Sequence, residues 1–549
     1  MKFHEAVARS LHAHGVDTVF GVLGDGNLFA FNSFAQLDGT RFRSMSHEAG
    51  AVLAALGYAQ ASGRLGVATV THGPGLTNTM TALVEAARAH CPLLLVAGDT
   101  PPDAPHHLQA VDQAAVARAG EAGFVEVRDA ATIGRDVAVA VAEAYRRRGP
   151  VVLDIGAELT WADVDDALLH AGSHAHGQEA GSDVLDPDAM DEALGMLAGA
   201  RRPVILAGRG AISGSSRAAL IDLSEVLACP LATTLRGKDL FRGLPHALGI
   251  FGTLSSPVAL DVIATSDAVI SFGASLNRWT TLDGSLLKGK ALIDVDVDCH
   301  KVLPGSPRHA VQLRGDAGAL GSALASQLRN ASVPPTRFAS QDMADRLAAW
   351  DPAASIRDAS TDTSVDLRTA MVRLDAAFPR DRTVVVDGGR FAHAAMGTLG
   401  VPDPSAYLHT LHFGSIGLGL AEAIGAHAAA PDRPVLLVAG DGGFMLGGLH
   451  EFSSAVRHRV DLVVVVLNDS AYGAEYVQLA DRGMDPEICT FAWASFAGMA
   501  EALGGVGVTA RNLAELDAAL GLVERRDRTR PMLIEVTLDP ATVPSAAYL

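Results

Sequence analysis

The chain has few of the residues that cross-link secreted proteins or bind structural metals. Its four cysteines, at positions 91, 229, 299 and 489, are too far apart for a CxxC or Cys/His metal motif. We therefore expect reduced, buried thiols in a cytoplasmic protein instead of disulfides. The N-terminal segment 1–15 has the pattern of an amphipathic helix and lacks the apolar stretch of a secretion signal.

Positive charge and long apolar runs are scarce as well. The chain has 43 Lys and Arg against 62 Asp and Glu, which gives a formal net charge of −19. Because no basic excess offsets phosphates, we expect no nucleic-acid partner. No stretch reaches about 18 uninterrupted apolar residues, so we expect no membrane span. A small-molecule substrate is the remaining expectation.

Glycine and aliphatic residues are abundant by contrast. The 549 residues include 56 glycines, and 49% are hydrophobic although only 5% are aromatic. Strand and helix patterns alternate in three blocks, 1–165, 187–330 and 366–549, and the polar segments 169–186 and 330–365 between them have the composition of linkers. We therefore predict an α/β protein of three doubly wound parallel-sheet domains.

The stretch 434–473 carries the strongest functional pattern. An apolar strand pattern at 435–439 ends at the glycine turn 440–443, apolar residues at helical spacing follow from Met445 to Val456, and a second strand pattern at 462–467 ends at Asn468. This order predicts a βαβ unit with polar groups where both strands end. In open parallel sheets that edge is where ligands bind.

The residues at this edge suit a phosphate and a metal ion. The glycines let backbone N–H groups approach a phosphate, but Asp441 in the same turn would repel it unless a cation lay between them. Asp441 and Asn468 both offer oxygen, which suits Mg²⁺. A tight turn with a capping Asp is the alternative interpretation.

The Gly440-Asp441-Gly442 turn followed by Asn468 resembles the GDG…N signature of thiamine diphosphate enzymes. The whole chain is similar to the acetolactate synthase, benzaldehyde lyase and pyruvate decarboxylase superfamily, and most of all to acetolactate synthase large subunits. The resemblance implies pyrimidine-binding, central and diphosphate-binding domains in that order. It implies that Asp441, Asn468 and the main-chain carbonyl of Ser470 hold Mg²⁺. The residues that it places against thiamine diphosphate are Gly389, Arg390, Phe391, Gly414, Ile416, Gly440, Asp441, Gly442, Gly443, Asn468, Ala471 and Tyr472.

Glu48 is the second element of the resemblance. The sequence SHEAGA at 46–51, followed by GYA at 57–59, resembles the family's R-H-E-x-G-A…G-Y-A segment. That similarity implies a catalytic Glu48, whose carboxylate binds the pyrimidine ring of the cofactor and favours the tautomer that serves as an internal base. On its own, an acid at the first turn of a helix is common and only stabilises the helix N-terminus.

Three further residues are catalytic candidates. The segment 71–78 (THGPGLTN) resembles the family's T-S-G-P-G-x-T-N loop, with His72 in place of a small residue and a predicted helix at 76–89 behind it. Gln109 matches the L-Q-A context of benzaldehyde lyase, and the pair His106-His107 is similar to the H-H pair of pyruvate decarboxylases but lies slightly earlier in the chain. Ile416, in a segment similar to the family's G-x-M-G-x-G, takes the place of the apolar residue that bends the cofactor. Each of these residues has a structural alternative, as a loop or packing residue.

Departures from the family pattern leave the reaction open. Acetolactate synthases carry Phe, Lys and Trp where this chain has Leu108, Glu121 and Leu479. An acetolactate synthase-like carboligase, a 2-keto acid decarboxylase and a C–C lyase or hydrolase are therefore all candidates, with Glu475 and Leu479 as pocket residues. A non-catalytic homologue is the alternative from another class, against which the retention of Glu48, Asp441 and Asn468 argues.

The resemblance also bears on cofactors and assembly. The loops 208–210, 273–278 and 294–296 are similar to central-domain loops that occur in the family with and without flavin, so FAD in the central domain stays open. In that family the Glu of one subunit meets the diphosphate site of another. The resemblance thus implies a homodimer or homotetramer with shared active sites.

Overall fold

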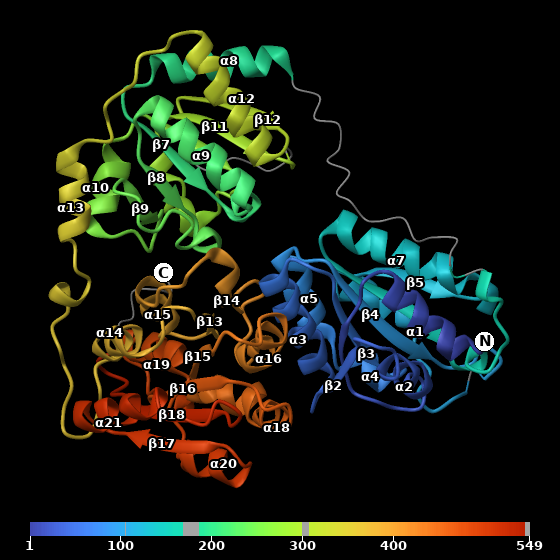
Figure 1. Ribbon diagram of the computed structural model, residues 1–549. Helices are drawn as coiled ribbons and strands as arrows, with labels where there is room; N and C mark the ends of the chain where they lie inside the picture. Colours follow the sequence, from blue (N-terminus) through green and yellow to red (C-terminus); the bar gives the residue numbers. More distant parts are fainter. Residues whose placement is uncertain (105, 168, 170–185, 299–306, 544–549) are drawn as a thin grey trace. The chain divides into compact units, whose positions relative to one another are not determined.

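The structure is a computed structural model that describes residues 1–543 apart from 105, 168, 170–185 and 299–306. Its described residues form three six-stranded parallel sheets with helices on both faces (Figure 1), which confirms the predicted α/β class. The chain divides into two compact units, Met1–His176 with Arg357–Ala395 and Leu408–Leu549, and Gly177–Ile356 with Met396–Tyr407. The predicted linker 169–186 lies almost entirely outside the described residues.

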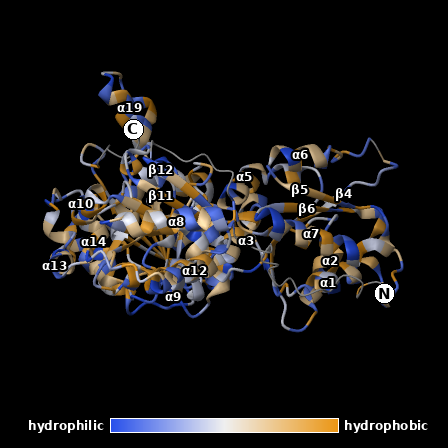
Figure 2. Cartoon of the chain, turned by 90° about the horizontal axis from the view of Figure 1, so that it is seen from above, coloured by the Kyte–Doolittle hydropathy of each residue, from blue (hydrophilic) through white to orange (hydrophobic). Residues whose placement is uncertain are grey.

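The first sheet has the strand order β2-β1-β3-β4-β6-β5. Its strands are β1 Thr18–Gly21, β2 Arg41–Ser44, β3 Gly66–Val70, β4 Leu93–Asp99, β5 Gly123–Val127 and β6 Pro150–Gly156. Its helices are α1 Phe3–Ala13, α2 Leu28–Ala35, α3 Glu48–Ser62, α4 Pro74–Thr77, α5 Met80–Ala89, α6 Gln113–Ala119 and α7 Ile133–Arg147. Apolar residues run along strands such as β6 (Figure 2), as expected for strands covered on both faces.

The second sheet, with the order β12-β11-β10-β7-β8-β9, belongs to the other unit. Its strands are β7 Pro203–Ala207, β8 Leu231–Thr233, β9 Ala247–Ile250, β10 Ala268–Phe272, β11 Ala291–Asp296 and β12 His309–Arg314. Its helices are α8 Pro187–Gly199, α9 Gly214–Leu227, α10 Pro257–Thr265, α11 Arg278–Thr281, α12 Ala317–Asn330 and α13 Gln341–Ala349. Helix α13 lies inside the segment 330–365 that we predicted as a linker, and it buries Met343 and Ala344, so that prediction is wrong for 341–349.

The third sheet has the order β14-β13-β15-β16-β18-β17. Its strands are β13 Thr383–Val386, β14 Tyr407–His409, β15 Val435–Gly440, β16 Leu462–Asn468, β17 Val506–Ala510 and β18 Met532–Thr537. Its helices are α14 Leu367–Ala377, α15 Ala392–Thr398, α16 Gly419–Ala429, α17 Asp441–Gly443, α18 Leu449–Arg457, α19 Gly473–Asp481, α20 Phe496–Ala502 and α21 Leu513–Val523.

Helices α3 and α16 join the first and third sheets into one unit. Both are apolar around most of their circumference, as expected for buried helices. They cross at glycines: a Cβ on Gly57 would lie 2.1 Å from the carbonyl oxygen of Glu422, and one on Gly425 would lie 1.8 Å from that of Ala54. The two backbones therefore approach as closely as glycine allows.

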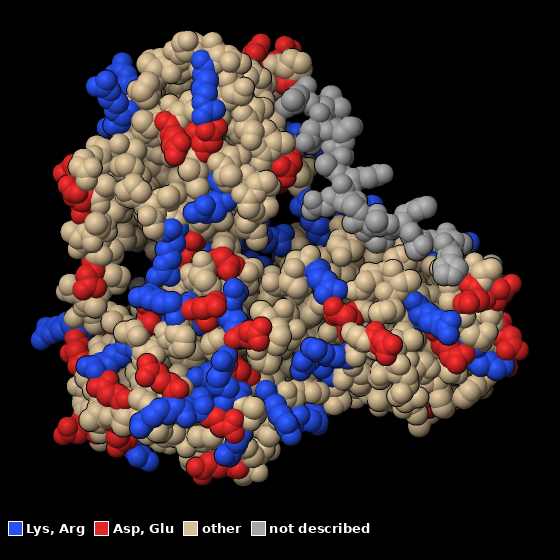
Figure 3. All heavy atoms as spheres, viewed as in Figure 1, with Lys and Arg blue, Asp and Glu red and all other residues tan. Residues whose placement is uncertain are grey.

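The remaining sequence expectations concern thiols, charge and membranes. Cys91, Cys229 and Cys489 are buried and form no disulfide among the described residues, as predicted, while Cys299 lies outside the described residues. On the face shown in Figure 3, acidic and basic side chains are intermixed. No helix within the described residues is long and apolar enough to cross a membrane.

Candidate active site

The predicted magnesium ligands lie at the carboxyl edge of the third sheet. Strands β15 and β16 pair in parallel with Gly440 opposite Leu467, so Asp441 and Asn468 follow directly at neighbouring strand ends. Asp441 is buried and begins the single turn α17. The strands are runs of Val and Leu without one exposed residue, and this burial fixes their register and hence the position of both side chains.

The amide of Asn468 has its orientation set by a second acid. Its Nδ2 donates to Oε1 of Glu535 at 2.9 Å, and Glu535 lies in the otherwise apolar strand β18. Since a carboxylate only accepts, the amide nitrogen must face Glu535 and Oδ1 must face away. Oδ1 accepts from the backbone N–H of Ser470 at 3.0 Å, which turns the chain so that Ser470 has a φ of 56°.

The electrostatics of this edge suit a cation. Burial, followed by the charge of nearby Asp469, raises the pKa of Asp441 to about 7. Burial also raises the pKa of Asp469, against the opposing effect of Arg390. Asp441 is buried and Asp469 is mostly buried, and Arg390 binds Asp469. The charge of Asp441 is left without a cation among the described residues, and a divalent cation would stabilise the ionised forms of both acids.

Arg390 has donors to spare for an anion. Its Nη2 binds Asp469 at 3.2 Å and the carbonyl of Pro540 at 2.7 Å. Its Nε and Nη1 are buried without a hydrogen-bond partner among the described residues. Such orphaned donors are costly, which fits a site that holds a diphosphate. The residues present thus suit Mg²⁺ together with a diphosphate.

Two glycines beside the predicted magnesium and diphosphate site, here called the cradle, leave no room for a larger side chain. A Cβ on Gly442 would lie 2.6 Å from the ring of Tyr472, and Gly389 has a φ of 154° beside the ring of Phe391. In the described part of the chain, no three His, Cys, Asp or Glu side chains cluster as metal ligands. The predicted ligand set differs in kind, because it combines one carboxylate, one amide oxygen and one main-chain carbonyl.

The loop that carries Ile416 is held at both ends by buried acids. Glu85 of α5 accepts from the backbone N–H groups of His412 and Phe413 at 3.1 and 2.6 Å. Asp387, at the end of β13, accepts from those of Gly417 and Leu418 at 3.0 and 3.3 Å. Between the two acids, Gly414 and Gly417 adopt φ values of 87° and 84°, which favour glycine. The loop is therefore positioned by both the first and the third sheet.

Glu48 is the first residue of α3, and His47 caps this helix. The Glu48 carboxylate accepts from Nδ2 of Asn78 at 3.0 Å. We predicted one helix over 76–89, but the structure breaks it between α4 and α5, and Asn78 lies in the break. Across the unit, Glu451 of α18 accepts from the N–H groups of Ser46 and His47.

His72 and Gln109 lie together at the carboxyl edge of the first sheet. His72 is 3% exposed, and its Nε2 lies 2.6 Å from Oε1 of Gln109. An amide oxygen only accepts, so Nε2 carries the proton. Oδ1 of Asp25 lies 3.5 Å from the same nitrogen, and the His107 ring stands edge-on at 5.5 Å. His106 is exposed and lies outside this group.

The structure thus places the predicted residues in four groups, which are the Asp441–Asn468 edge, the Ile416 loop, Glu48, and the His72–Gln109 pair. Within the described residues, no hydrogen bond or ion pair joins Glu48, His72 or Gln109 to Asp441 or Asn468. The pocket candidates Glu475 and Leu479 lie on α19, of which no residue is buried and which stands clear of the unit in Figure 2.

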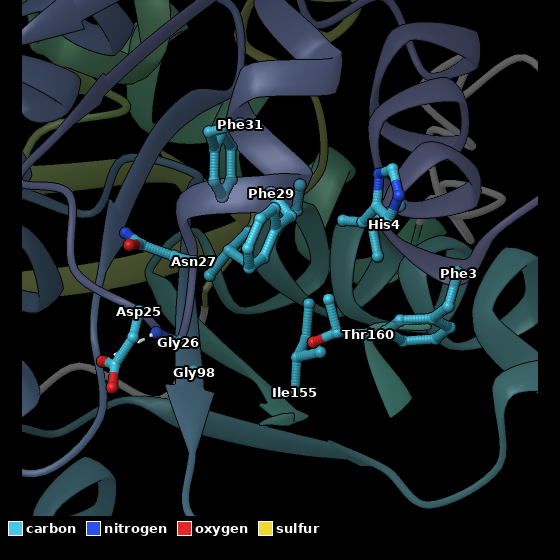
Figure 4. Close-up of a pocket in the computed structure, with 13 residues that line it drawn as sticks. Phe3, His4, Asp25, Gly26, Asn27, Phe29, Phe31, Gly98, Ile155 and Thr160 are labelled. Atoms are coloured by element: carbon cyan, nitrogen blue, oxygen red, sulfur yellow. Dashed lines mark hydrogen bonds between the residues drawn. The ribbon is translucent and has the colours of Figure 1, made fainter. Parts of the chain in front are cut away.

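Neither of two cavities in the described part of the chain is lined by a predicted site residue. One, of about 20 Å³, lies behind Asp25 and Gly26 among Phe3, Phe29 and Phe31 (Figure 4), and has room for about one water molecule. The other, of about 520 Å³, lies beside α13 in the unit of the second sheet.

The buried acid Asp154 is linked through Gln113 to the loop that carries His72. Gln113 donates from Nε2 to Asp154 at 2.5 Å and accepts from the N–H of Gly73 at 3.2 Å. Burial, together with the neighbouring Asp99, raises the pKa of Asp154 in β6 to about 8. The folded chain therefore holds a proton here that the unfolded chain releases above about pH 4.

We expect D154N to remove part of the pH dependence of stability. Because the folded-state pKa is raised, wild-type stability falls between about pH 4 and pH 8, with a slope of up to about 1.4 kcal/mol per pH unit. The asparagine is neutral throughout and mimics the protonated acid. Melting temperatures across this range should favour the variant increasingly as pH rises, while D129N at an exposed helix cap stays parallel to wild type. If the melting temperatures of D154N and wild type changed in parallel with pH, the raised pKa of Asp154 would be contradicted.

A buried carboxylate at the same sheet edge as an amide oxygen and a main-chain carbonyl, with unpaired arginine donors nearby, is typical of enzymes that hold a phosphorylated cofactor through a divalent cation. Residues 1–116 match the model of the thiamine pyrophosphate enzyme N-terminal TPP binding domain, 190–324 match the central domain, and 387–536 match the C-terminal TPP binding domain. Thiamine pyrophosphate (TPP) is another name for thiamine diphosphate. The chain belongs to the thiamine pyrophosphate enzyme family.

Its relatives carry several activities in their names. A "Probable 2-ketoarginine decarboxylase" of Pseudomonas aeruginosa is 31% identical over 85% of this chain and 82% of its own length. A sulfoacetaldehyde acetyltransferase of Alcaligenes xylosoxydans xylosoxydans is 28% identical over 94% and 89%, respectively. The acetolactate synthase isozyme 2 large subunit of Escherichia coli is 26% identical over 97% and 95%.

FAD in the central domain is not supported by these matches, since the matched description names only a thiamine pyrophosphate enzyme central domain. At the switch of strand order between β7 and β10, a Cβ on Gly208 would be 2.3 Å from the carbonyl oxygen of Gly273. The two loops therefore approach each other as closely as glycine allows.

Sequence reasoning missed several residues of the site. Glu535 and Trp493 bind the predicted ligands Asn468 and Asp441. Glu85 and Asp387 bind the two ends of the loop that carries Gly414 and Ile416. A sequence signal existed for Glu535, because it is a lone charge inside the apolar strand pattern 532–537. The partners of Glu85 and Trp493 are far away in the chain, and no local pattern reveals them.

Proposed function

We propose that this protein is a thiamine diphosphate- and Mg²⁺-dependent enzyme that makes or breaks C–C bonds at 2-keto acids or 2-hydroxyketones, as an acetolactate synthase-like carboligase. The observation that carries the proposal is the buried Asp441 beside Asn468, with uncompensated negative charge and the unpaired nitrogens of Arg390 next to it. The proposed enzyme is cytoplasmic and works as a homodimer or homotetramer with shared active sites.

The proposed binding roles follow from this edge. Asp441, Asn468 and the Ser470 carbonyl hold Mg²⁺, and Arg390 donates to the diphosphate. The backbone of the two glycine turns and the rings that border them complete the cradle, through Gly389, Phe391, Gly440, Gly442, Gly443, Ala471 and Tyr472.

The proposed catalytic roles use the other groups. When bound, the cofactor would supply a carbon nucleophile for a substrate carbonyl group. Glu48 would share a proton with the pyrimidine ring, and the Gly414 carbonyl would accept from its amino group. Ile416 would pack against the cofactor from the loop that Glu85 and Asp387 hold. His72 binds the oxygen of Gln109, so that the amide N–H groups of Gln109 remain available to a substrate oxygen.

A 2-keto acid decarboxylase, or a C–C lyase or hydrolase, is the second candidate. The decarboxylase is favoured by the name of the relative from Pseudomonas aeruginosa. It is also favoured by Leu479, which stands where the resemblance places the acceptor-selecting Trp. An enzyme without an acceptor pocket would release an aldehyde instead of joining two substrates.

A panel of 2-keto acids and 2-hydroxyketones separates these reactions. We expect carbon dioxide release from at least one 2-keto acid, with a 2-hydroxyketone or 2-hydroxyacid as the organic product of the carboligase and an aldehyde as that of the decarboxylase. Mass spectrometry of the products, with Mg²⁺ and cofactor omitted as the control, makes the distinction. No bound thiamine diphosphate and no thermal shift with cofactor plus Mg²⁺ would instead support a non-catalytic homologue.

A further inference from the structure

The side chain of Trp493 binds the predicted magnesium ligand Asp441, although the two residues are far apart in the sequence. Its indole Nε1 donates to Oδ2 of Asp441 at 2.9 Å, across 52 positions of sequence. The indole is half-buried and stacks on Phe491, with ring centroids 4.5 Å apart and an angle of 21°. Phe496 packs against its edge at 6.2 Å. The ring is thus held on two sides while its one polar group points at the acid.

The backbone beside Trp493 contacts a second predicted ligand. The N–H of Phe491 donates to the carbonyl oxygen of Ser470 at 2.8 Å, and the N–H of Tyr472 donates to the carbonyl of Cys489 at 2.9 Å. Ala471 and Thr490 form an antiparallel bridge. The segment 489–493, here called the strap, therefore binds two of the three oxygen ligands through one rigid piece of backbone and one ring.

These contacts leave room for a metal ion. A carboxylate offers about four acceptor sites and a carbonyl two, so an oxygen that accepts one hydrogen bond can still bind a cation. A donor on one side of Asp441 fixes the rotation of its carboxylate, because Gly442 N–H donates to the other oxygen at 2.8 Å. A carboxylate held in this way loses less freedom when Mg²⁺ binds.

We propose that Trp493 is a positioning residue, whose indole N–H orients Asp441 for Mg²⁺ and whose ring fixes the strap over the ligand carbonyl of Ser470. This inference rests on the proposed function, because it assumes that Asp441 and Ser470 hold Mg²⁺. The strap also closes the loop 473–489, on which Glu475 and Leu479 lie. The strap then holds both the magnesium ligands and the loop with the candidate substrate residues.

Replacing the indole by a phenyl ring tests the hydrogen bond separately from the stacking. W493F keeps a ring on Phe491 but removes the donor, and W493Q keeps an N–H donor but removes the ring. We expect the Mg²⁺ concentration for half-maximal binding of thiamine diphosphate to rise about 10-fold in W493F, the usual effect of losing a hydrogen bond to a charged group. W493Q should fall between W493F and wild type. Equilibrium dialysis measures this without turnover.

Trp161 provides the matched control. It is 57% exposed and packs on Phe29, with 4.9 Å between ring centroids, away from every predicted ligand. W161F should bind cofactor as wild type does and should keep the change in tryptophan emission when Mg²⁺ and thiamine diphosphate are added together. That change should be absent in W493F.

The outcomes separate the two proposals. Wild-type protein that binds no thiamine diphosphate at any Mg²⁺ concentration overturns the proposed function. Wild-type binding with an unchanged Mg²⁺ requirement in W493F overturns the role of Trp493, even if the melting temperature of W493F is lower, since that marks a purely structural residue. A W493Q that is weaker than W493F overturns the role of the indole N–H, because the ring would then carry the effect. An emission change that survives in W493F overturns the role of Trp493 as a whole.

Discussion

E48A is expected to bind thiamine diphosphate and Mg²⁺ but to lose turnover by about 10²- to 10⁴-fold, the usual contribution of a positioned proton-transfer group. Glu48 is distant in sequence from the Asp441 edge and has no described hydrogen bond to it, so the affinity for the diphosphate should change little. Steady-state kinetics on the active substrate of the panel, with cofactor binding measured in parallel, check the split.

E48Q is the matched variant for this test. A glutamine still offers an oxygen to Asn78, whose Nδ2 donates to Glu48 at 3.0 Å, so the break between α4 and α5 should persist. It cannot share a proton as a carboxyl group does. We expect E48Q to be almost as slow as E48A with a melting temperature close to that of wild type. Wild-type turnover in either variant would contradict the proposed catalytic role of Glu48.

D441N is expected to abolish Mg²⁺-dependent cofactor binding. The amide has no charge and only one oxygen, whereas the carboxylate accepts from Gly442 at one oxygen and from Trp493 at the other. Wild-type protein at a cofactor concentration of about 100 times Kd should gain about 2.7 kcal/mol of stability, and the variant should gain none. Thermal shift assays with and without cofactor and Mg²⁺ measure this difference.

Without cofactor, the substitution D441N should not lower the melting temperature at high pH. Burial raises the pKa of Asp441 to about 7, so the ionised acid lowers stability progressively between about pH 4 and pH 7. Above pH 7 the cofactor-free D441N should therefore melt at or above the wild-type temperature. D381N, at a 79% exposed side chain, is the control and should match wild type in both states. A cofactor-induced shift of wild-type size in D441N would show that the metal site lies elsewhere.

The sequence predicted the parts of this protein that depend on local pattern. Strands such as β15 and β16 are runs of Val and Leu, which can only be buried, and the polar residues that follow them had to meet at one edge. The pairing of Asp441 with Asn468 was predictable for this reason. The break before α5 was not, because Asn78 and Thr79 lie in an otherwise regular helical pattern.

Contacts between distant segments were beyond reach of the sequence. Glu85 is fully buried and binds His412 and Phe413, more than 300 positions later in the chain. Trp493 points its N–H at Asp441, 52 positions earlier. Such choices are decided by packing between elements, which periodicity does not encode.

The glycine crossing of α3 and α16 limits how this chain can be recombined with its relatives. A methyl group at Gly57 or Gly425 would collide with backbone, which does not rotate away as a side chain does. A chimera that takes α3 from one parent and α16 from another therefore combines two helix surfaces that did not evolve to pack against each other. Exchange points placed in the unit of the second sheet leave that fit intact, so the central domain is the natural cassette for swapping.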